Sequence, residues 1–157
     1  MNIQFWSVGK NHEAYVEAGI TEFTKRISNY YPVSWKIISP PRNAGLLTES
    51  DLKKKEAEAI LKPLEPQDYF IVLDEKGKNL GSVQLAEFLQ SRANESTKQV
   101  IFLIGGAFGV DASVLQRANF KWSLSLLTFP HQLVRLILAE QVYRACSILR
   151  NEKYHHI

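Results

Sequence analysis

Apolar and polar positions follow two different periods along the chain, and this pattern predicts strands that alternate with helices. Short apolar or alternating runs, typical of strands, occupy residues 3–8, 33–38, 69–73, 99–104 and 123–127. Apolar residues at helical spacing occupy residues 11–27, 51–61, 82–92, 111–118 and 130–149. The order indicates an α/β fold with a mainly parallel sheet flanked by helices, and we expect residues 1–157 to form a single domain.

Polar and turn-forming residues predict where these elements begin and end. Asn11, Ser82 and Asp111 each precede a helical pattern and are suited to act as N-caps. Residues 40–45 contain two prolines and a glycine, so we expect a flexible loop there. Residues 74–78 are polar and follow the third predicted strand, which predicts a second loop.

Three segments that each follow a predicted strand are candidates for a binding pocket: residues 73–78, 105–110 and 128–130. Ligands of open α/β sheets bind at the carboxyl ends of the strands, so we expect these segments to meet there. Gly105 and Gly106 would let the backbone approach a ligand closely. Their spacing matches neither the dinucleotide fingerprint nor a P-loop, and a tight turn without a ligand is the alternative.

The apolar stretch that leads into Thr128, Phe129 and Pro130 is a second candidate for ligand binding. Such a segment can form a flat, mainly apolar slot with exposed backbone groups, which suits an adenine ring. The alternative is an ordinary last strand of the core.

The last predicted helix, residues 130–149, is apolar around most of its circumference. A helix of this kind must be covered on more than one side, and we favour a homodimer as the cover. Arg135 falls inside the apolar arc, so a partner should pair with its charge. Glu140 and Arg144 are four residues apart and can form a helix-surface ion pair, whereas Cys146 is expected to serve packing.

Composition narrows the class of protein. The single cysteine excludes an internal disulfide and fits a reducing compartment. We see no signal peptide and no run that approaches the roughly 20 apolar residues of a membrane span, so we expect a soluble, cytoplasmic protein. Residues 117–157 carry a net charge of +4 and residues 1–116 a net charge of −1, which would draw a polyanion to the C-terminal region.

The C-terminal tail combines aromatic and basic residues, the types that stack on and clamp a nucleotide. It ends in Lys153, Tyr154, His155, His156 and Ile157. The two adjacent histidines lack a cysteine or carboxylate cluster at ligand spacing, so we expect no metal site.

Taken together, several stretches resemble the ribosomal RNA large subunit methyltransferase H family of the SPOUT superfamily. They are residues 73–78 (Leu-Asp-Glu-Lys-Gly-Lys), residues 104–109 (Ile-Gly-Gly-Ala-Phe-Gly), residues 124–144 and the closing Tyr154-His155. The resemblance spans essentially the whole chain, and the Thr-Phe-Pro-His-Gln-Leu-Val-Arg run within it is specific. The chain departs from the family's pattern at its end, where His156 stands in place of Lys or Arg and Ile157 is added.

The resemblance implies a fold, a cofactor and a substrate. It implies a trefoil knot near the C-terminus, a homodimer, and S-adenosylmethionine (SAM) bound in the knot. The substrate would be a pseudouridine in the 23S rRNA of the assembled ribosome, methylated at N3. The positions that match the family's SAM contacts are Leu73, Gly105, Leu124, Ser125, Leu126, Leu127, Thr128 and Phe129.

Methylation at N3 requires that the base lose a weakly acidic proton, and a cation near the uracil oxygens would lower the cost of that loss. Our hypothesis gives this part to Arg144, with Tyr154 and His155 holding the base. His155 could instead be the general base, because the ordinary pKa of histidine suits that task.

Two other classes of protein are alternatives. A nucleotide-dependent oxidoreductase would use the glycine loop for NAD, although the glycine spacing is wrong for it. A non-catalytic rRNA-binding or assembly factor would need only the basic C-terminal third, but it would leave the strand-end loops without a function.

Overall fold

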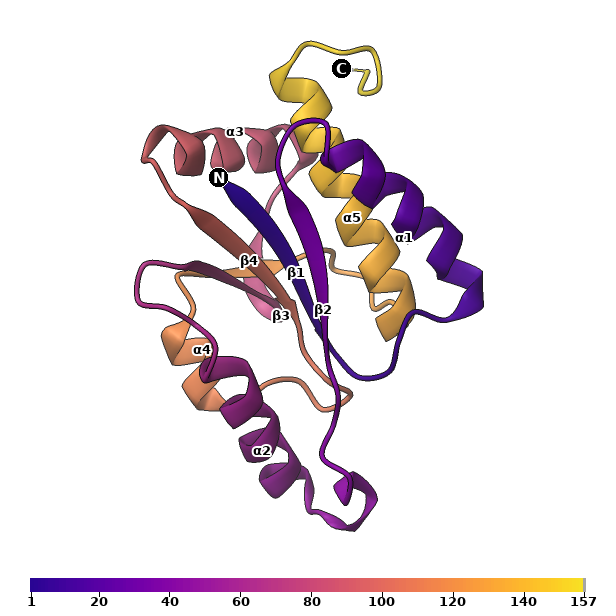
Figure 1. Ribbon diagram of the computed structural model, residues 1–157, viewed down its shortest axis with the longest axis vertical. Helices are drawn as coiled ribbons and strands as arrows, with labels where there is room; N and C mark the ends of the chain where they lie inside the picture. The colour runs from indigo at the N-terminus through magenta and orange to yellow at the C-terminus, as the bar shows by residue number, and fades with distance from the viewer. Residues whose placement is uncertain (157) are drawn as a thin grey trace.

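The computed structural model describes residues 1–156, and these form a five-stranded parallel sheet between two layers of helices (Figure 1). The strands are β1 (Asn2–Val8), β2 (Val33–Ile38), β3 (Tyr69–Asn79), β4 (Gln99–Ile104) and β5 (Phe120–Ser123). The helices are α1 (Ala14–Ile27), the 3-10 helix η1 (Ala44–Leu46), α2 (Glu49–Leu61), α3 (Ser82–Asn94), α4 (Ala112–Arg117) and α5 (His131–Leu149). The predicted α/β architecture is confirmed.

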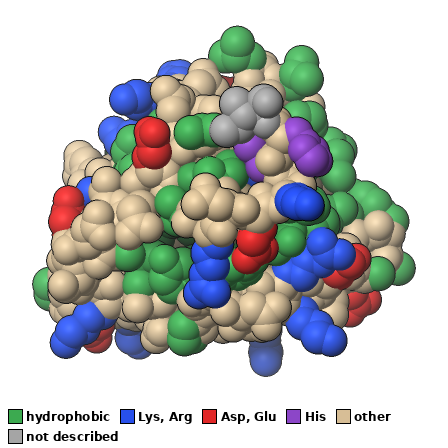
Figure 2. Space-filling model, turned by 90° about the horizontal axis from the view of Figure 1, so that it is seen from above, with side chains coloured by type: hydrophobic (Ala, Val, Ile, Leu, Met, Phe, Trp, Pro, Cys, Tyr) green, Lys and Arg blue, Asp and Glu red, His purple; other side chains and the backbone are tan. Residues whose placement is uncertain are grey.

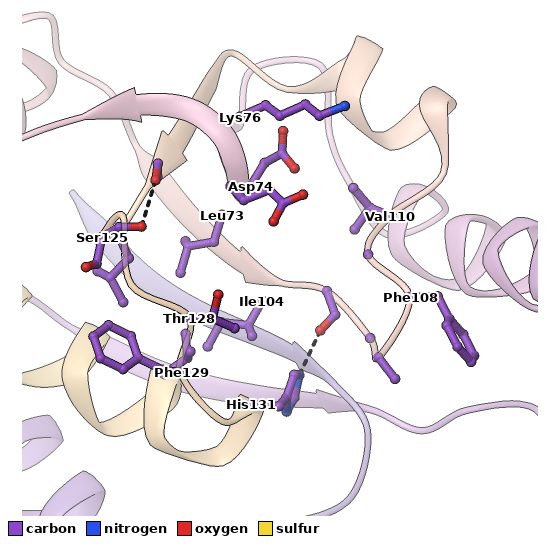
Figure 3. Close-up of a pocket in the computed structure, with 18 of the residues that line it drawn as sticks. Leu73, Asp74, Lys76, Ile104, Phe108, Val110, Ser125, Thr128, Phe129 and His131 are labelled. Carbon is purple, nitrogen blue, oxygen red and sulfur yellow. Dashed lines mark hydrogen bonds between the residues drawn. The ribbon is translucent and has the colours of Figure 1, made fainter.

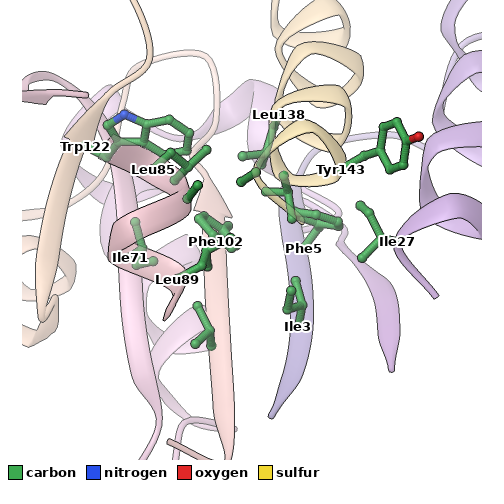
Figure 4. Close-up of a cluster of buried hydrophobic side chains, with 14 of the residues drawn as sticks. Ile3, Phe5, Ile27, Ile71, Leu85, Leu89, Phe102, Trp122, Leu138 and Tyr143 are labelled. Carbon is green, nitrogen blue, oxygen red and sulfur yellow. The ribbon is translucent and has the colours of Figure 1, made fainter. Parts of the chain in front are cut away.

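The strand order β2-β1-β4-β3-β5 places the most apolar strands, β1, β4 and the first half of β3, at the centre of the sheet. Helices α1, α3 and α5 cover one face, and α2 and α4 cover the other. Figure 4 shows the first of these cores, where Leu85 of α3 and Leu138 of α5 lie on either side of Phe102. Both faces of the sheet are therefore buried, as the continuous apolar runs indicate.

Strand β3 extends further than predicted, and the expected polar loop at residues 74–78 is wrong. After a register shift, Lys78 and Asn79 pair with Trp122 and Ser123 of β5. A Cβ on Gly77 would lie 2.7 Å from the Lys121 backbone carbonyl, so the two strands approach too closely there for a side chain. This contact, which the polarity of the segment hides, accompanies the pairing of Lys78 and Asn79 with β5, while residues 74–77 span the register shift.

Strand β5 is shorter and lies earlier than the predicted strand at residues 123–127. It pairs only with β3 and ends at Ser123. The chain then turns, since the Ser125 hydroxyl accepts a hydrogen bond from the Leu127 backbone N–H at 3.0 Å. The side chains of Leu126 and Leu127 are 90% and 71% exposed, so their apolar character does not mark a core strand.

Helix caps agree with the predictions in one case and differ in two. Asp111 caps α4 by accepting from the Ser113 backbone N–H at 3.1 Å, as predicted. Helix α1 begins at Ala14, after Glu13, so Asn11 is not its cap. Helix α3 is preceded by Gly81, and the hydroxyl of Ser82 instead donates to Gln141 of α5.

The loop predicted at residues 40–45 runs into η1, and α2 begins two residues earlier than predicted because Thr48 caps it. Helix α5 begins immediately after Pro130, as predicted.

Candidate functional site

The three segments predicted to meet at the sheet edge surround one cavity of about 690 Å³ (Figure 3). One wall is the end of β3 at residues 73–76, and the second is the loop at 105–110. The third is the segment from 123 to 129 together with the first turn of α5. The cavity is within the roughly 300–1,000 Å³ range of small-molecule sites, and it lies at the carboxyl ends of parallel strands, where such sites are built.

Most of the predicted cofactor residues line this cavity. They are Leu73, Gly105, Leu124, Ser125, Leu127, Thr128 and Phe129. Leu126 does not line it, and its side chain points into solvent. The structure thus brings together seven of the eight positions, while contact with a cofactor stays a prediction for all of them.

Close packing leaves little room for a side chain at Gly105 and Gly106 of the second wall. A Cβ on Gly105 would lie 2.7 Å from Cγ1 of Val110, and one on Gly106 would lie 2.7 Å from Oε2 of Glu56. Gly109 has a φ of +80° and its N–H donates to the Gly106 carbonyl at 3.1 Å, which closes a tight turn. Burial raises the pKa of the Glu56 carboxyl. The sequence pattern did not predict that this residue of α2 packs against the glycine loop.

His131 was not predicted as a site residue, yet it lines the cavity and supports the glycine loop. Its Nε2 lies 2.7 Å from the carbonyl oxygen of Gly105, which can only accept, so Nε2 carries the proton. Burial lowers the pKa of His131, and the cation of Arg135 lowers it further, against the opposing effect of the bond to Gly105. The ring is therefore held neutral beside the pocket.

Arg135 lies one turn after His131 in α5 and is fully buried. The predicted charged partner is absent among residues 1–156, where Arg135 forms no salt bridge. Its Nη1 instead donates to Nδ1 of His12 at 3.2 Å, and a Cβ on Gly9 would lie 3.5 Å from its Nη2. Burial lowers the pKa of Arg135 and also that of His12.

The three predicted catalytic residues form a second cluster, which is organised by Glu140. Oε1 of Glu140 accepts from Arg144 at 3.0 Å (Nε) and 2.6 Å (Nη2), and from the Tyr154 hydroxyl at 2.9 Å. Nη1 of Arg144 lies 3.2 Å from Nδ1 of His155. Sequence reasoning had interpreted Glu140 only as half of a surface ion pair. The spacing of four residues is visible in the sequence, but its contact with the tail is not.

The geometry of the second cluster bears on the protonation of His155. Arginine only donates, so Nδ1 of His155 accepts, and a neutral ring then carries its proton on Nε2. In this arrangement His155 presents an N–H donor to its surroundings. Burial raises the pKa of Tyr154, and its bond to Glu140 raises it further, so this phenol is a hydrogen-bond donor in the cluster.

The cavity and the second cluster lie at opposite ends of α5. His131 begins the helix, and Arg144 follows thirteen residues later, a separation of about 20 Å along the helix axis at 1.5 Å per residue. In Figure 1 the segment that follows α5 leaves the upper end of the helix, whereas α5 begins at its lower end. Within one chain, a group held by Arg144 is thus far from a ligand of the cavity.

Three further observations concern other kinds of site and segment. Among residues 1–156, no group of three or more His, Cys, Asp or Glu side chains is arranged to hold a metal ion. Cys146 is buried in the core, and burial raises its thiol pKa to about 12, which makes it a packing residue rather than a nucleophile. No helix in the described part of the chain is long and apolar enough to cross a membrane.

Comparison with known proteins agrees with the predicted resemblance. The family described as predicted SPOUT methyltransferase matches residues 1–155. The chain is 42% identical over 156 residues to the ribosomal RNA large subunit methyltransferase H of Cytophaga hutchinsonii, covering 99% of this chain and 100% of that protein. It is 44% identical to the protein of the same name from Flavobacterium johnsoniae, with 99% of both chains covered.

A solved structure shares the fold. It is a probable methylase family protein from Haemophilus influenzae Rd KW20, with a TM-score of 0.54, 9% sequence identity, and coverage of 99% of this chain and 70% of that chain. The family match over almost the full length and the identity above 40% to full-length relatives show that this chain belongs to the ribosomal RNA large subunit methyltransferase H family of SPOUT methyltransferases.

Proposed function

We propose that this protein is an enzyme that transfers the methyl group of SAM to N3 of a pseudouridine in 23S rRNA, on the assembled ribosome. Family membership and the printed names of the relatives support the reaction class and the RNA. The single observation that carries the proposal is the cavity formed by three strand-end segments, beside the helix that ends in the Arg144 cluster. The ribosomal substrate would place the enzyme in the cytoplasm.

The lining of the cavity fits SAM. Leu73, Ile104 and Leu124 provide an apolar wall for the adenine ring. Asp74 and Lys76 at the rim provide charges of both signs for the ammonium and carboxylate of the methionine part (Figure 3). When bound, SAM supplies an already activated methyl group. The residues of the cavity need only orient it and exclude water.

The second cluster fits the other requirement, removal of the N3 proton. Arg144 is held in place by two charge-assisted bonds to Glu140 and keeps its guanidinium beside His155. A cation held in this way would stabilise the negative charge that develops on the uracil oxygens as N3–H gives its proton to water, and the N3 anion then accepts the methyl group. The Nε2–H of His155 can donate to one of the same oxygens, which favours a positioning and donor role over that of general base.

The separation of the two sites supports a homodimer. A base that contacts Arg144 and a methyl donor in the same chain's cavity would be about 20 Å apart along α5. We infer that Arg144, Tyr154 and His155 of one chain serve the cavity of a second copy. A two-fold symmetric pair with antiparallel α5 helices would bring them together. We include in this proposal the trefoil knot near the C-terminus that the resemblance implies.

The experiment that tests the function is transfer of labelled methyl from SAM to ribosomes from cells that lack the gene, followed by mapping of the modified base. We expect label on a single pseudouridine of the large-subunit RNA. Label found only on other RNAs would show that the enzyme has a different RNA substrate. Ribosome binding that is independent of SAM and occurs without methyl transfer would favour a binding protein. Absence of both transfer and SAM binding would overturn the proposal.

A further inference from the structure

A chain of tyrosine and arginine side chains joins the end of α1 to the C-terminal tail. The guanidinium of Arg150 lies 4.8 Å from the ring centroid of Tyr30, and that ring lies 6.3 Å from the ring of Tyr143. Tyr143 is 4.6 Å from Tyr154, and Arg26 lies 5.3 Å from the Tyr143 centroid. These contacts make the turn after α1 continuous with the cluster around Arg144.

This region carries cations that the protein does not neutralise. Arg26 and Arg144 are paired with Glu22 and Glu140. Three exposed cations of the same region form no salt bridge among residues 1–156; they are Lys25, Arg150 and Lys153. On the face seen in Figure 2, Lys and Arg side chains lie close to histidine side chains. These three cations outnumber the exposed acidic Glu152 of the same region, so the surface keeps a net positive charge beside the predicted catalytic cluster.

An aromatic ring holds one of these cations, Arg150, in place without neutralising it. The guanidinium of Arg150 rests on the ring of Tyr30, and the hydroxyl of Tyr30 donates to Glu152, which fixes the ring. A guanidinium stacked in this way keeps its N–H donors at the edge, where they can bind an anion. Such an edge matches the oxygens of a phosphate, since the planar fork of arginine binds them in a bidentate manner.

We propose that Lys25, Arg26, Tyr30, Arg150 and Lys153, here called the tail surface, bind the phosphate backbone of the RNA segment that flanks the target nucleotide. This inference rests on the proposed function and adds a second contact region to it. The tail surface adjoins Arg144 and His155, so a strand whose base enters the catalytic cluster passes over it. Lys25, Arg150 and Lys153 form no salt bridge among residues 1–156 and are the groups that phosphates would neutralise on binding, whereas Arg26 keeps its bond to Glu22. RNA is the partner whose chemistry fits both these charges and the rings.

The test uses the full-length protein and ribosomes that lack the modification, with KM for ribosomes and kcat measured at several salt concentrations. The variants are Arg150→Gln with Lys153→Gln, and Arg150→Lys as the conservative form. Lys62→Gln is the matched control, because Lys62 is exposed and follows α2 on the other face of the sheet. SAM affinity and thermal unfolding are measured for each variant.

We expect the double variant to raise KM for ribosomes on the order of 10-fold, and to make the slope of log KM against log salt shallower by about one to two. Its kcat and SAM affinity should match the wild type. Arg150→Lys, which keeps the charge but lacks the planar fork, should have a KM between those of the double variant and the wild type. KM and salt dependence equal to those of Lys62→Gln would overturn the inference, as would a loss confined to kcat. Failure of the wild type to methylate ribosomes at all would instead count against the proposed function.

Discussion

The Nε2 atom of His131 lies 2.7 Å from the carbonyl oxygen of Gly105, so the first residue of α5 is tied to the first residue of the glycine loop. The same ring lines the cavity, and a Cβ on Gly9 would lie 3.7 Å from its Cε1. The loop after β1, the loop after β4 and α5 therefore meet at one histidine. Loss of this histidine should therefore weaken ligand binding in the cavity more than it destabilises the core.

Replacing His131 with alanine should weaken SAM binding. The variant removes one buried hydrogen bond that holds the Gly105 carbonyl, a loss of about 0.5–1.5 kcal/mol or roughly 3- to 10-fold in Kd. Isothermal titration with SAM measures the change. His156→Ala, in the exposed tail, is the control that should bind as the wild type does. Equal affinity of the two variants would contradict a supporting role for His131.

Stability should fall as the pH drops below the ordinary histidine pKa of 6.5. The pKa of His131 is lowered in the folded protein, chiefly by burial, as is that of His12. The unfolded chain thus binds these protons more readily, so the stabilisation is complete above pH 6.5 and is lost at lower pH. Urea unfolding between about pH 7.5 and about 5.5 measures the slope. The slope should be shallower in His131→Asn; an unchanged slope would exclude His131 as its source.

Gly77→Ala should destabilise the protein because β3 and β5 cannot separate without losing their pairing. The added Cβ would lie 2.7 Å from the backbone of Lys121 and Trp122. Forcing an atom into such a contact costs about 1–3 kcal/mol in the free energy of unfolding. Gly45→Ala is the matched control, since nothing lies within 4 Å of a Cβ there. Chemical unfolding of both variants distinguishes them, and equal stabilities would show that the strands adjust freely.

The same segment shows what a sequence pattern can and cannot predict. The central strands were predicted because apolar runs such as residues 99–104 are buried on both faces. Residues 74–79 are polar, and only the pairing of Lys78 and Asn79 with β5 keeps the end of β3 in the sheet. Leu126 and Leu127 have the opposite character, apolar but exposed, and they were wrongly assigned to a strand. Local polarity predicts burial, but pairing between distant strands decides the edges of a sheet.

The candidate site also combines features that the sequence predicts with features that it does not. The strand-end position of Leu73 and Gly105 follows from the fold class, so the place of the cavity could be predicted. The role of Glu140 could not, because its bond to Tyr154 joins residues fourteen positions apart through the turn of the tail. The support that His131 gives to Gly105 spans twenty-six positions and has no sequence signature.

Glu140→Gln should lower kcat while leaving SAM affinity unchanged. The substitution keeps the size of the side chain but removes the charge that holds Arg144 and orients Tyr154. Bonds to charged groups contribute about 1.5–3 kcal/mol, which corresponds to a loss on the order of 10- to 100-fold. Single-turnover methyl transfer measures it. Glu95→Gln, which breaks the Arg92 ion pair elsewhere, is the control. Wild-type turnover in Glu140→Gln would remove Glu140 from the mechanism.

A mixture of two inactive variants should recover activity if the catalytic cluster of one chain serves the cavity of another. Gly105→Val would distort the cavity wall, because even a Cβ there would lie 2.7 Å from Cγ1 of Val110, and Arg144→Ala would disable the cluster. With random exchange, half of the dimers combine the two chains, and each has one complete site of two. Recovery should therefore approach about one quarter of wild-type activity.

The size of the recovery is what distinguishes the two arrangements. If each chain used its own cluster, every site in the mixed dimer would carry one defect and no activity would return. His131 and Arg144 are about 20 Å apart along α5. The proposed chemistry is therefore incompatible with an arrangement in which each chain uses its own cluster. Mixing two preparations of the same variant controls for exchange itself. A mixed sample as inactive as its parents, with mixed dimers demonstrated by mass spectrometry, would show that the cluster of one chain does not serve the cavity of the other.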